Sequence, residues 1–302
     1  MRGMRKRTGI AIMLGVATLV VAGGLGTGIA VSAGGAGSRR ALTTPVESAG
    51  GGAHPTLVPK LPAPTPITKP LVTLYGDSLA WEAQDDFVAA FRGLPAVQVL
   101  TRTYGGTAIC DWLATMRDDE ANLAPGAVVI EFSGNALTPC MEDAAGQGLT
   151  GDAYWARYRA DAQTVLETFA PSDTRVFLAG APISHNQELT GDFHGSLVNA
   201  MYAQIANGRL DVTYIDAGAA VLDHGHWTPT MPCLPGEPCT GGTDSTGRPF
   251  NVVRAPDGGH FCPAGEEAKR GVTGACPVWS SGAFRYANAM AQPVIDNLTP
   301  LR

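Results

Sequence analysis

Three well-separated segments of the sequence carry side chains that could act together in acyl transfer. Ser78 follows a hydrophobic run within Gly-Asp-Ser-Leu at 76–79, and Asp257 lies three residues before His260. Asn135 ends a Ser-Gly-Asn segment, again directly after a hydrophobic run. A serine becomes a useful nucleophile beside a base, a histidine held by an aspartate is such a base, and an amide can donate to an oxyanion. These residues predict chemistry through a serine ester.

Each segment also has a structural interpretation. Glycine, aspartate and serine are common in turns, so the segment around Ser78 alone predicts a strand-to-helix turn with a helix cap. Asp257 and His260 could belong to a polar loop, and Asn135 could satisfy loop backbone. Their combination favours the chemical interpretation, because an acid and a histidine three residues apart can share a hydrogen bond. The other histidines of the folded part lack that spacing, and we expect surface or structural roles for His185, His194, His224 and His226.

Short apolar runs alternate with helical patterns from residue 71 onward. Strands are predicted at Leu71–Tyr75, Val97–Thr103, Ala127–Phe132, Arg175–Leu178 and Val212–Ile215. Helices are predicted at Leu79–Arg92, after a cap at Asp111, at Asp152–Phe169, at Leu197–Ile205 and at Gly282–Ile295. This alternation predicts a parallel sheet covered on both faces, a three-layer α/β/α sandwich. Ser78 and Asn135 then both follow strand ends, where such sheets bind ligands.

The motifs together resemble the SGNH hydrolase family, also called GDSL esterases and lipases. Residues 76–79 match its first block, Gly106 the second with Gly105 as the alternative, Asn135 the third, and 257–260 the last. The resemblance covers about residues 71 to 297. One departure is Ser133, which stands where the family's Gly-x-Asn block has glycine, so the turn that aims Asn135 could differ.

The resemblance implies a flavodoxin-like sandwich and a defined division of labour. Ser78 would attack an ester carbonyl, His260 would act as general base, and Asp257 would orient it. The backbone N–H groups of Ser78 and Gly106 and the Asn135 side chain would form the oxyanion hole. No metal or organic cofactor is required.

The N-terminal 33 residues predict export. Basic residues precede an uncharged, largely apolar stretch from Gly9 to Ala33, which is long enough to cross a bilayer. Residues 1–33 are expected to be either a cleaved signal peptide or a membrane anchor with its basic residues on the cytoplasmic side, and the sequence does not decide between the two. Residues 34–69 are rich in Ala, Gly, Pro and Thr and predict a flexible tether. Residues 70–302 form the predicted catalytic domain, outside the cytoplasm.

Six cysteines fit an oxidising compartment. Sequence proximity predicts the disulfides Cys110–Cys140, Cys233–Cys239 and Cys262–Cys276. The first bridge would tie the loop after Gly106 to the loop after Asn135. The region from His224 to Asn251 lacks periodicity and predicts a functional loop or a disulfide-pinned excursion. A zinc site from Cys233, Cys239, His224 and His226 is disfavoured, because no paired Cys-x-x-Cys spacing occurs.

The formal charge of −6 argues against a nucleic-acid partner. The leading functional hypothesis is an exported serine ester hydrolase acting on a small-molecule, glycan or lipid ester. One alternative is an O-acyltransferase or deacetylase acting on cell-wall glycan through the same site. Another is a non-catalytic surface protein that binds glycan or lipid. Trp112 and Trp227 are the tryptophans expected at a substrate cleft.

Overall fold

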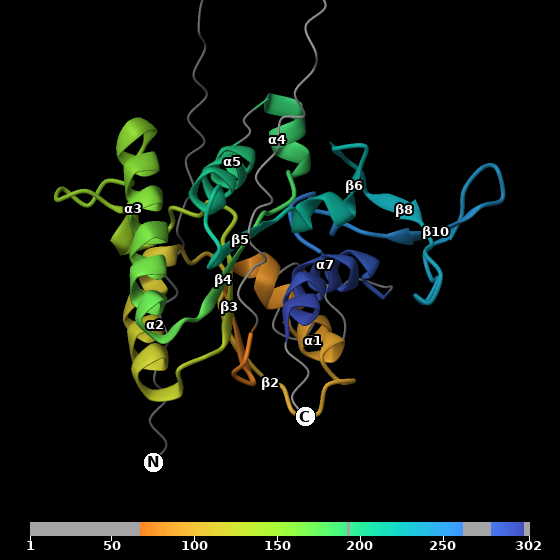
Figure 1. Cartoon of the computed structure of the whole chain (residues 1–302). Coiled ribbons are helices and arrows are strands. Elements are labelled where there is room, and N and C mark those ends of the chain that lie inside the picture. The colour runs from red at the N-terminus through yellow and green to blue at the C-terminus, as the bar shows by residue number, and fades with distance from the viewer. Residues whose placement is uncertain (1–66, 192–193, 262–278, 299–302) are drawn as a thin grey trace, which may run out of the picture. The chain divides into compact units, whose positions relative to one another are not determined.

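The computed structural model describes residues 67–191, 194–261 and 279–298, and Figure 1 shows their arrangement. Within these residues, five parallel strands form one sheet in the order β2-β1-β3-β4-β5. Their bounds are Leu71–Gly76 (β1), Gln98–Thr103 (β2), Ala127–Glu131 (β3), Arg175–Ala179 (β4) and Val212–Ile215 (β5). The predicted parallel sheet is therefore confirmed, and each strand begins and ends within two residues of its prediction.

The inner strands form because their residues are buried on both faces. All five residues of β3 and of β4 are buried, as are the last five of β1. Such continuous apolar runs are typical of strands in a sheet covered by helices on both sides. Their parallel register places Gly76 opposite Glu131, and Glu131 opposite Ala179. The segments that follow β1, β3 and β4 therefore leave the sheet at one edge.

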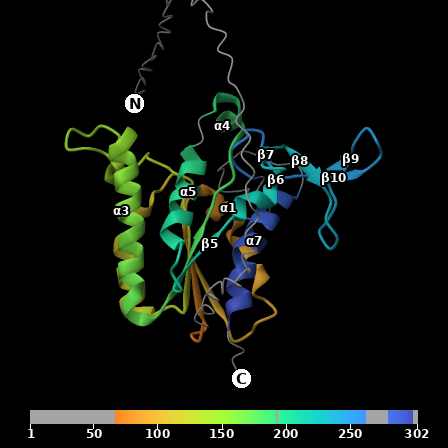
Figure 2. The same ribbon diagram turned by 45° about the horizontal axis from the view of Figure 1, so that its top comes forward.

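Two layers of helices enclose the sheet, as Figures 1 and 2 show. Helices α1 (Ser78–Ala90) and α7 (Ser281–Asn297) bury Phe87, Met290 and their apolar neighbours against one face. Helices α2 (Ile109–Leu123), α3 (Gly151–Phe169) and α5 (His194–Ala206) cover the other face. The three-layer sandwich is confirmed.

The predicted cap at Asp111 is wrong by three residues. Helix α2 begins at Ile109, after an N-cap at Ala108, and Asp111 lies in the first turn. Its carboxylate accepts the N–H of Ala108 at 2.8 Å. An acid at this position reaches back to the start of a helix as the second half of a capping box does, which explains the misplaced boundary.

The region that lacked periodicity contains short antiparallel elements. β6 (Leu222–Asp223) pairs with β7 (His226–Trp227), and β10 (Pro249–Val252) lies between β8 (Thr230–Pro232) and β9 (Gly242–Thr243). The Cys233–Cys239 disulfide closes the turn after β8, as predicted. This excursion is fastened to the sandwich by Glu237, whose buried carboxylate accepts from Arg285 of α7.

A helix that the sequence pattern did not predict, α4 (His185–Thr190), follows β4. It is only six residues long and carries no buried residue, so apolar periodicity could not mark it. Its capping box, in which Ser184 and Gln187 bond each other's backbone, was the available signal.

The described chain begins at Ile67, which is buried and whose N–H donates to Asn297 O at 2.9 Å. The packed domain thus includes residues just before the predicted start at residue 70. The predicted signal peptide or anchor at 1–33, most of the tether and the Cys262–Cys276 pair lie outside the described residues. Among the residues described, no helix has both the length and the apolar character needed to span a bilayer.

Candidate active site

The sheet edge brings the predicted nucleophile and base into contact. Ser78 is the first residue of α1, directly after β1, and His260 lies on the loop after β10. The His260 Nε2 atom is 2.9 Å from Ser78 Oγ, and His260 Nδ1 is 2.8 Å from Asp257 Oδ2. The Ser78–His260 contact joins residues 182 positions apart in the sequence. The three side chains have the mutual geometry of a serine–histidine–aspartate triad.

Asp257 holds the imidazole in the orientation that the chemistry needs. Its Oδ1 accepts the backbone N–H groups of Gly259 and His260 at 2.9 and 3.0 Å. Burial acts to raise the pKa of Asp257, but these hydrogen bonds and the imidazole outweigh it, so this pKa lies below its ordinary value. An ionised Asp257 accepts the Nδ1 proton of His260, which leaves Nε2 free to take the proton of Ser78.

The start of α1 leaves one backbone amide uncommitted. A helix has four initial N–H groups without intrahelical acceptors. The N–H of Asp77 donates to Glu131 O at 3.2 Å, and that of Leu79 donates to Asp77 Oδ1 at 3.0 Å. The N–H of Ala80 donates to Glu131 Oε2 at 3.2 Å. The fourth N–H belongs to Ser78, and within the described parts of the chain no residue accepts from it. It is available to an oxyanion at the positive end of the helix.

Asn135, the side chain predicted to donate to an oxyanion, is held by a buried aspartate. Asp77 is fully buried, and its Oδ2 accepts from Asn135 Nδ2 at 2.9 Å. One of the two amide hydrogens of Asn135 is thereby committed, and the other remains for a ligand. The backbone oxygen of Asn135 accepts from Tyr158 of α3 at 2.9 Å. Asn135 is thus fixed from the sheet and from the helix layer.

Ser133, the departure from the family pattern, strengthens this arrangement. Its N–H and its hydroxyl both donate to Asp77 Oδ2, at 2.7 and 2.6 Å. The turn itself is made by Gly134, whose φ is +105° and whose Cβ would lie 2.9 Å from the Tyr154 hydroxyl. Because Gly134 supplies the freedom that the turn needs, a serine is tolerated at 133 and adds hydrogen bonds.

A second carboxyl group lies beneath the site. Glu131 is fully buried at the end of β3 and accepts from Tyr286 of α7 at 2.9 Å. Burial first, and then the nearby charge of Asp77, raise the pKa of Glu131 well above its ordinary value. Burial also raises the pKa of Asp77, although hydrogen bonds from Ser133 and Leu79 oppose it. Of the two carboxyl groups, Glu131 therefore has the stronger tendency to hold a proton.

The structure distinguishes the two candidate glycines after β2. A Cβ on Gly105 would lie 3.7 Å from Ser78 Cβ, whereas one on Gly106 would meet nothing within 4 Å. Gly106 has φ of +77° and turns the chain. Gly105 is thus the glycine packed beside the nucleophile, and the assignment of an oxyanion donor to Gly106 stays a prediction.

A hollow of about 260 Å³ opens beside the triad. Ser78, Asn135 and His260 line it, and so do Ser184 and Gln187. Most of the lining groups carry polar atoms. Trp112 and Trp227, which were expected at the cleft, are not among its described lining residues. Both indole N–H groups are bonded elsewhere: Trp112 Nε1 donates to Thr107 Oγ1 at 3.1 Å, and Trp227 Nε1 donates to Gly258 O at 2.8 Å.

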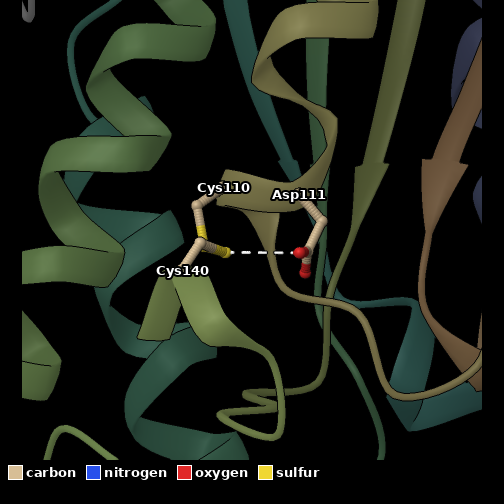
Figure 3. Close-up of side chains that lie close together, drawn as sticks. All are labelled: Cys110, Asp111 and Cys140. Atoms are coloured by element: carbon tan, nitrogen blue, oxygen red, sulfur yellow. Dashed lines mark hydrogen bonds between the residues drawn. A yellow bond between two sulfur atoms is a disulfide. The ribbon is translucent and has the colours of Figure 1, made fainter. Parts of the chain in front are cut away.

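The disulfide Cys110–Cys140 is present, as predicted, and it connects the segment after Gly106 to the segment after Asn135. It links the first turn of α2 to the short helix after Asn135, and Figure 3 shows the Asp111 carboxylate beside it. The three side chains lie close enough to suggest a metal site, but both sulfurs are spent in the disulfide. The same holds for Cys233 and Cys239, so the disfavoured zinc site lacks its thiolates.

Comparison with known proteins places the chain among relatives of undetermined activity. Residues 71–269 match the family described as protein of unknown function (DUF459). The chain belongs to the DUF459 family. The match spans the sheet and all the motif residues named above, so the site belongs to the DUF459 part of the chain. No curated protein matches.

Solved structures with a similar chain path include three hydrolases. A lipase/acylhydrolase from Enterococcus faecalis has 14% identity and a TM-score of 0.49, covering 77% of this chain and 98% of that one. A putative acylhydrolase from Bacteroides fragilis has 16% identity and a TM-score of 0.47, covering 78% and 91%. A GDSL-like lipase from Bacteroides thetaiotaomicron has 14% identity and a TM-score of 0.44, covering 76% and 88%. At such identities, activity must be argued from the residues of this DUF459 domain.

The structure brings together Ser78, Asp257, His260 and Asn135, as the sequence predicted. It adds Asp77 and Ser133, whose roles were missed because their partners lie 56 to 58 residues away. The remaining histidines that can be described have other partners: His185 stacks on Trp227, and His226 pairs with Glu188. His224 is exposed, and the side chain of His194 lies outside what is described.

Proposed function

We propose that this DUF459 protein is an extracytoplasmic serine ester hydrolase of the carboxylesterase type. The observation that carries the proposal is the continuous contact from Ser78 Oγ to His260 Nε2 (2.9 Å) and from His260 Nδ1 to Asp257 Oδ2 (2.8 Å). A nucleophile, a base and an orienting acid in this geometry have a defined use in acyl transfer. The motif resemblance to SGNH hydrolases supports the same reaction class.

The reaction would follow from these positions. Ser78 Oγ attacks the ester carbonyl carbon while its proton passes to His260 Nε2, and the carbonyl oxygen becomes an oxyanion. The Ser78 N–H and the free Asn135 Nδ2 hydrogen stabilise that oxygen. His260 then gives the proton to the leaving alcohol, and an acyl-enzyme remains on Ser78. Water then attacks the acyl carbon while His260 takes its proton, and the bond to Ser78 Oγ breaks as His260 returns that proton to Oγ, which releases the acid and restores the free enzyme.

The hollow favours a short acyl group on a polar alcohol. Its volume of about 260 Å³ is small, and its lining includes the polar residues Ser133, Ser184 and Gln187 besides the candidate catalytic groups. Ligand sites for long apolar chains are lined mainly by apolar side chains, which this one is not. An acetyl or similarly short ester of a hydroxyl-rich alcohol fits this lining better than a long-chain lipid.

The extracytoplasmic location rests on two features. Disulfides persist mainly in oxidising compartments, and Cys110–Cys140 and Cys233–Cys239 both have bonding geometry. The basic start and the apolar stretch from Gly9 to Ala33 have the pattern of an export signal or anchor. Sequencing the N-terminus of the protein from the native host would distinguish cleavage from anchoring.

The same site could transfer an acyl group to a sugar hydroxyl or deacetylate a cell-wall glycan. The polar hollow favours this as the second candidate, because a glycan hydroxyl could replace water as the acceptor. A product assay separates the two, since hydrolysis yields free acid and transfer yields an acylated glycan. A purely binding role is disfavoured because the nucleophile and base are both present and in contact.

The test is hydrolysis of nitrophenyl esters of graded acyl length by the oxidised full chain, with Ser78→Ala in parallel. We expect turnover that is highest for short acyl groups and that falls at least 10³-fold in the variant. No turnover by folded wild type would overturn the hydrolase proposal and favour glycan transfer or binding. Turnover that persists in Ser78→Ala would remove Ser78 as the nucleophile.

A further inference from the structure

The segment that carries the base is held by hydrogen bonds to several parts of the chain. Residues 254–261, here called the base loop, include Asp257 and His260. Gly258 O accepts the His185 N–H at 2.9 Å and Trp227 Nε1 at 2.8 Å. Arg254 reaches back from the start of the loop to Ile183 O at 3.1 Å. These contacts fix the base loop to the segment after β4 and to Trp227 of β7, and none of them reaches the helix that carries Ser78.

A buried glutamate makes the connection to that helix. Glu82 lies four residues after Ser78 on α1, so the two side chains share one face of the helix. Only 2% of Glu82 is exposed, and its Oε2 accepts the backbone N–H of Phe261 at 2.7 Å. Phe261 follows His260 directly and is itself fully buried. A glutamate is rarely buried to this extent without a partner that requires it.

We propose that Glu82 is a positioning residue that sets the distance between Ser78 and His260. One turn of α1 then specifies both partners: its first residue supplies the nucleophile, and its fifth holds the amide next to the base. Because a helix turn is rigid, displacement of the base loop relative to Ser78 would require breaking the Glu82–Phe261 hydrogen bond. This inference rests on the proposed function of Ser78 and His260.

The charges around Glu82 are compatible with this role. Arg254 is buried beside Phe261, with its guanidinium carbon 5.2 Å from that ring's centroid. Burial lowers the pKa of Arg254 to about 10, although the negative charges of Glu82 and Asp257 oppose this shift, so Arg254 is cationic at neutral pH. Its charge partly offsets that of Glu82 in a region with little water.

Two substitutions of similar size separate the hydrogen bond from the volume of the side chain. Glu82→Gln keeps an acceptor oxygen near Phe261, whereas Glu82→Met keeps the length and loses the acceptor. We expect Glu82→Met to lower kcat for a nitrophenyl ester by 10- to 100-fold, since small misplacements of a base have such effects. KM should stay within 2-fold, and Glu82→Gln should restore kcat to within about 3-fold of wild type.

Asp119→Ala is the matched control. Asp119 is also a buried carboxylate on a helix, but it bonds Tyr75 and Arg102 and not the base loop. Its loss should lower Tm and leave kcat unchanged, which separates misplacement of the base from general destabilisation. Should Glu82→Met not fold, Glu82→Asp withdraws the acceptor by one methylene and is expected to lower kcat at least 5-fold.

Hydrogen exchange of the base loop gives a readout that needs no activity. We expect faster exchange at residues 255–261 in Glu82→Met, with wild-type exchange there in Glu82→Gln and Asp119→Ala. If the wild type turns over no ester yet this pattern appears, the proposed function fails and the positioning inference survives. Wild-type kcat and unchanged exchange in Glu82→Met would overturn the inference. An equally large loss of kcat in Glu82→Gln and Glu82→Met would also overturn it, because the charge of Glu82 and not its acceptor oxygen would then be responsible.

Discussion

Replacing Asp77 with asparagine should impair both stability and turnover, although this residue touches neither a substrate nor the base. The carboxylate accepts four hydrogen bonds: one from Leu79 N, two from Ser133 and one from Asn135 Nδ2. Asparagine has the same shape but offers one acceptor oxygen. Whichever way the new amide turns, an N–H group must face another donor.

The cost follows from the better of the two orientations. If the oxygen faces Ser133 and Asn135, three hydrogen bonds lose their charge and weaken by about 1 kcal/mol each. The amide then faces Leu79 N–H, and loss of that helix cap costs about another 1 kcal/mol. Removing a fully buried charge recovers part of this, because burial disfavours the ionised form. We expect a net loss of about 2–3 kcal/mol in the free energy of unfolding.

The catalytic effect acts through Asn135. Without a firm acceptor at Asp77, the Asn135 amide loses its orientation, and loss of one oxyanion donor costs about 10²–10³ in kcat. We expect Asp77→Asn to lower kcat about 10²-fold and to change KM little. Kinetics on a short nitrophenyl ester and urea unfolding of the same preparations supply both numbers.

A double-mutant cycle with Asn135→Ala tests the route of this effect. If Asp77 acts through Asn135, the double variant should be about as slow as Asn135→Ala alone. Ser133→Ala serves as a graded control, since it removes one of the four hydrogen bonds and should cost about 1 kcal/mol. A kcat for Asp77→Asn within 2-fold of wild type would refute the reasoning, and so would fully additive losses in the cycle.

Two further predictions concern the disulfide and an acid outside the site. Cys110→Ser/Cys140→Ser removes a disulfide between residues 30 positions apart in the sequence, which should lower the free energy of unfolding by about 3–4 kcal/mol and lower turnover. Thermal unfolding and kinetics measure the two effects, and unchanged Tm and kcat would show that the bridge rigidifies nothing. Burial and then the charge of Asp85 raise the pKa of Asp86 to about 6. The folded state therefore binds the Asp86 proton more tightly than the unfolded state does, and it loses stability as pH rises from about 4 to about 6. Such a shift corresponds to a cost of about 3 kcal/mol for ionised Asp86 in the folded state, which solvent screening of a half-buried side chain reduces to about 1 kcal/mol. Asp86→Asn removes this cost, so it should stabilise the protein by about 1 kcal/mol at pH 7 and have no effect below pH 4. Equal stabilisation at both pH values would contradict this.

The sheet could be predicted from the sequence because its inner strands are continuous apolar runs between turn residues. The candidate triad could be predicted because strand-end positions in a parallel sheet converge at one edge. Ser78 and Asn135 follow neighbouring strands, and Asp257 and His260 carry their own spacing signal. In each case the information is local or depends on the period of one element.

The parts that escaped prediction depend on contacts between distant residues. The strands from β6 to β10 are two to four residues long, and the sheet of β8, β9 and β10 is stabilised by Cys233–Cys239 and by the pairing of Glu237 with Arg285, which no local pattern reports. The role of Asp77 as an acceptor for the β3 loop required knowing that β1 and β3 are neighbours. Trp227 was expected in the cleft, but stacking on His185 turns it toward the loop that it supports.

The most direct test of the account is covalent trapping of the nucleophile. The oxidised full chain would be treated with a fluorophosphonate and examined by intact-mass and peptide mass spectrometry. The account predicts one adduct per chain, located on Ser78, absent in Ser78→Ala and formed far more slowly in His260→Ala. A folded wild-type protein that gains no adduct, or that gains it on another residue, would contradict the assignment of Ser78 as a nucleophile activated by His260.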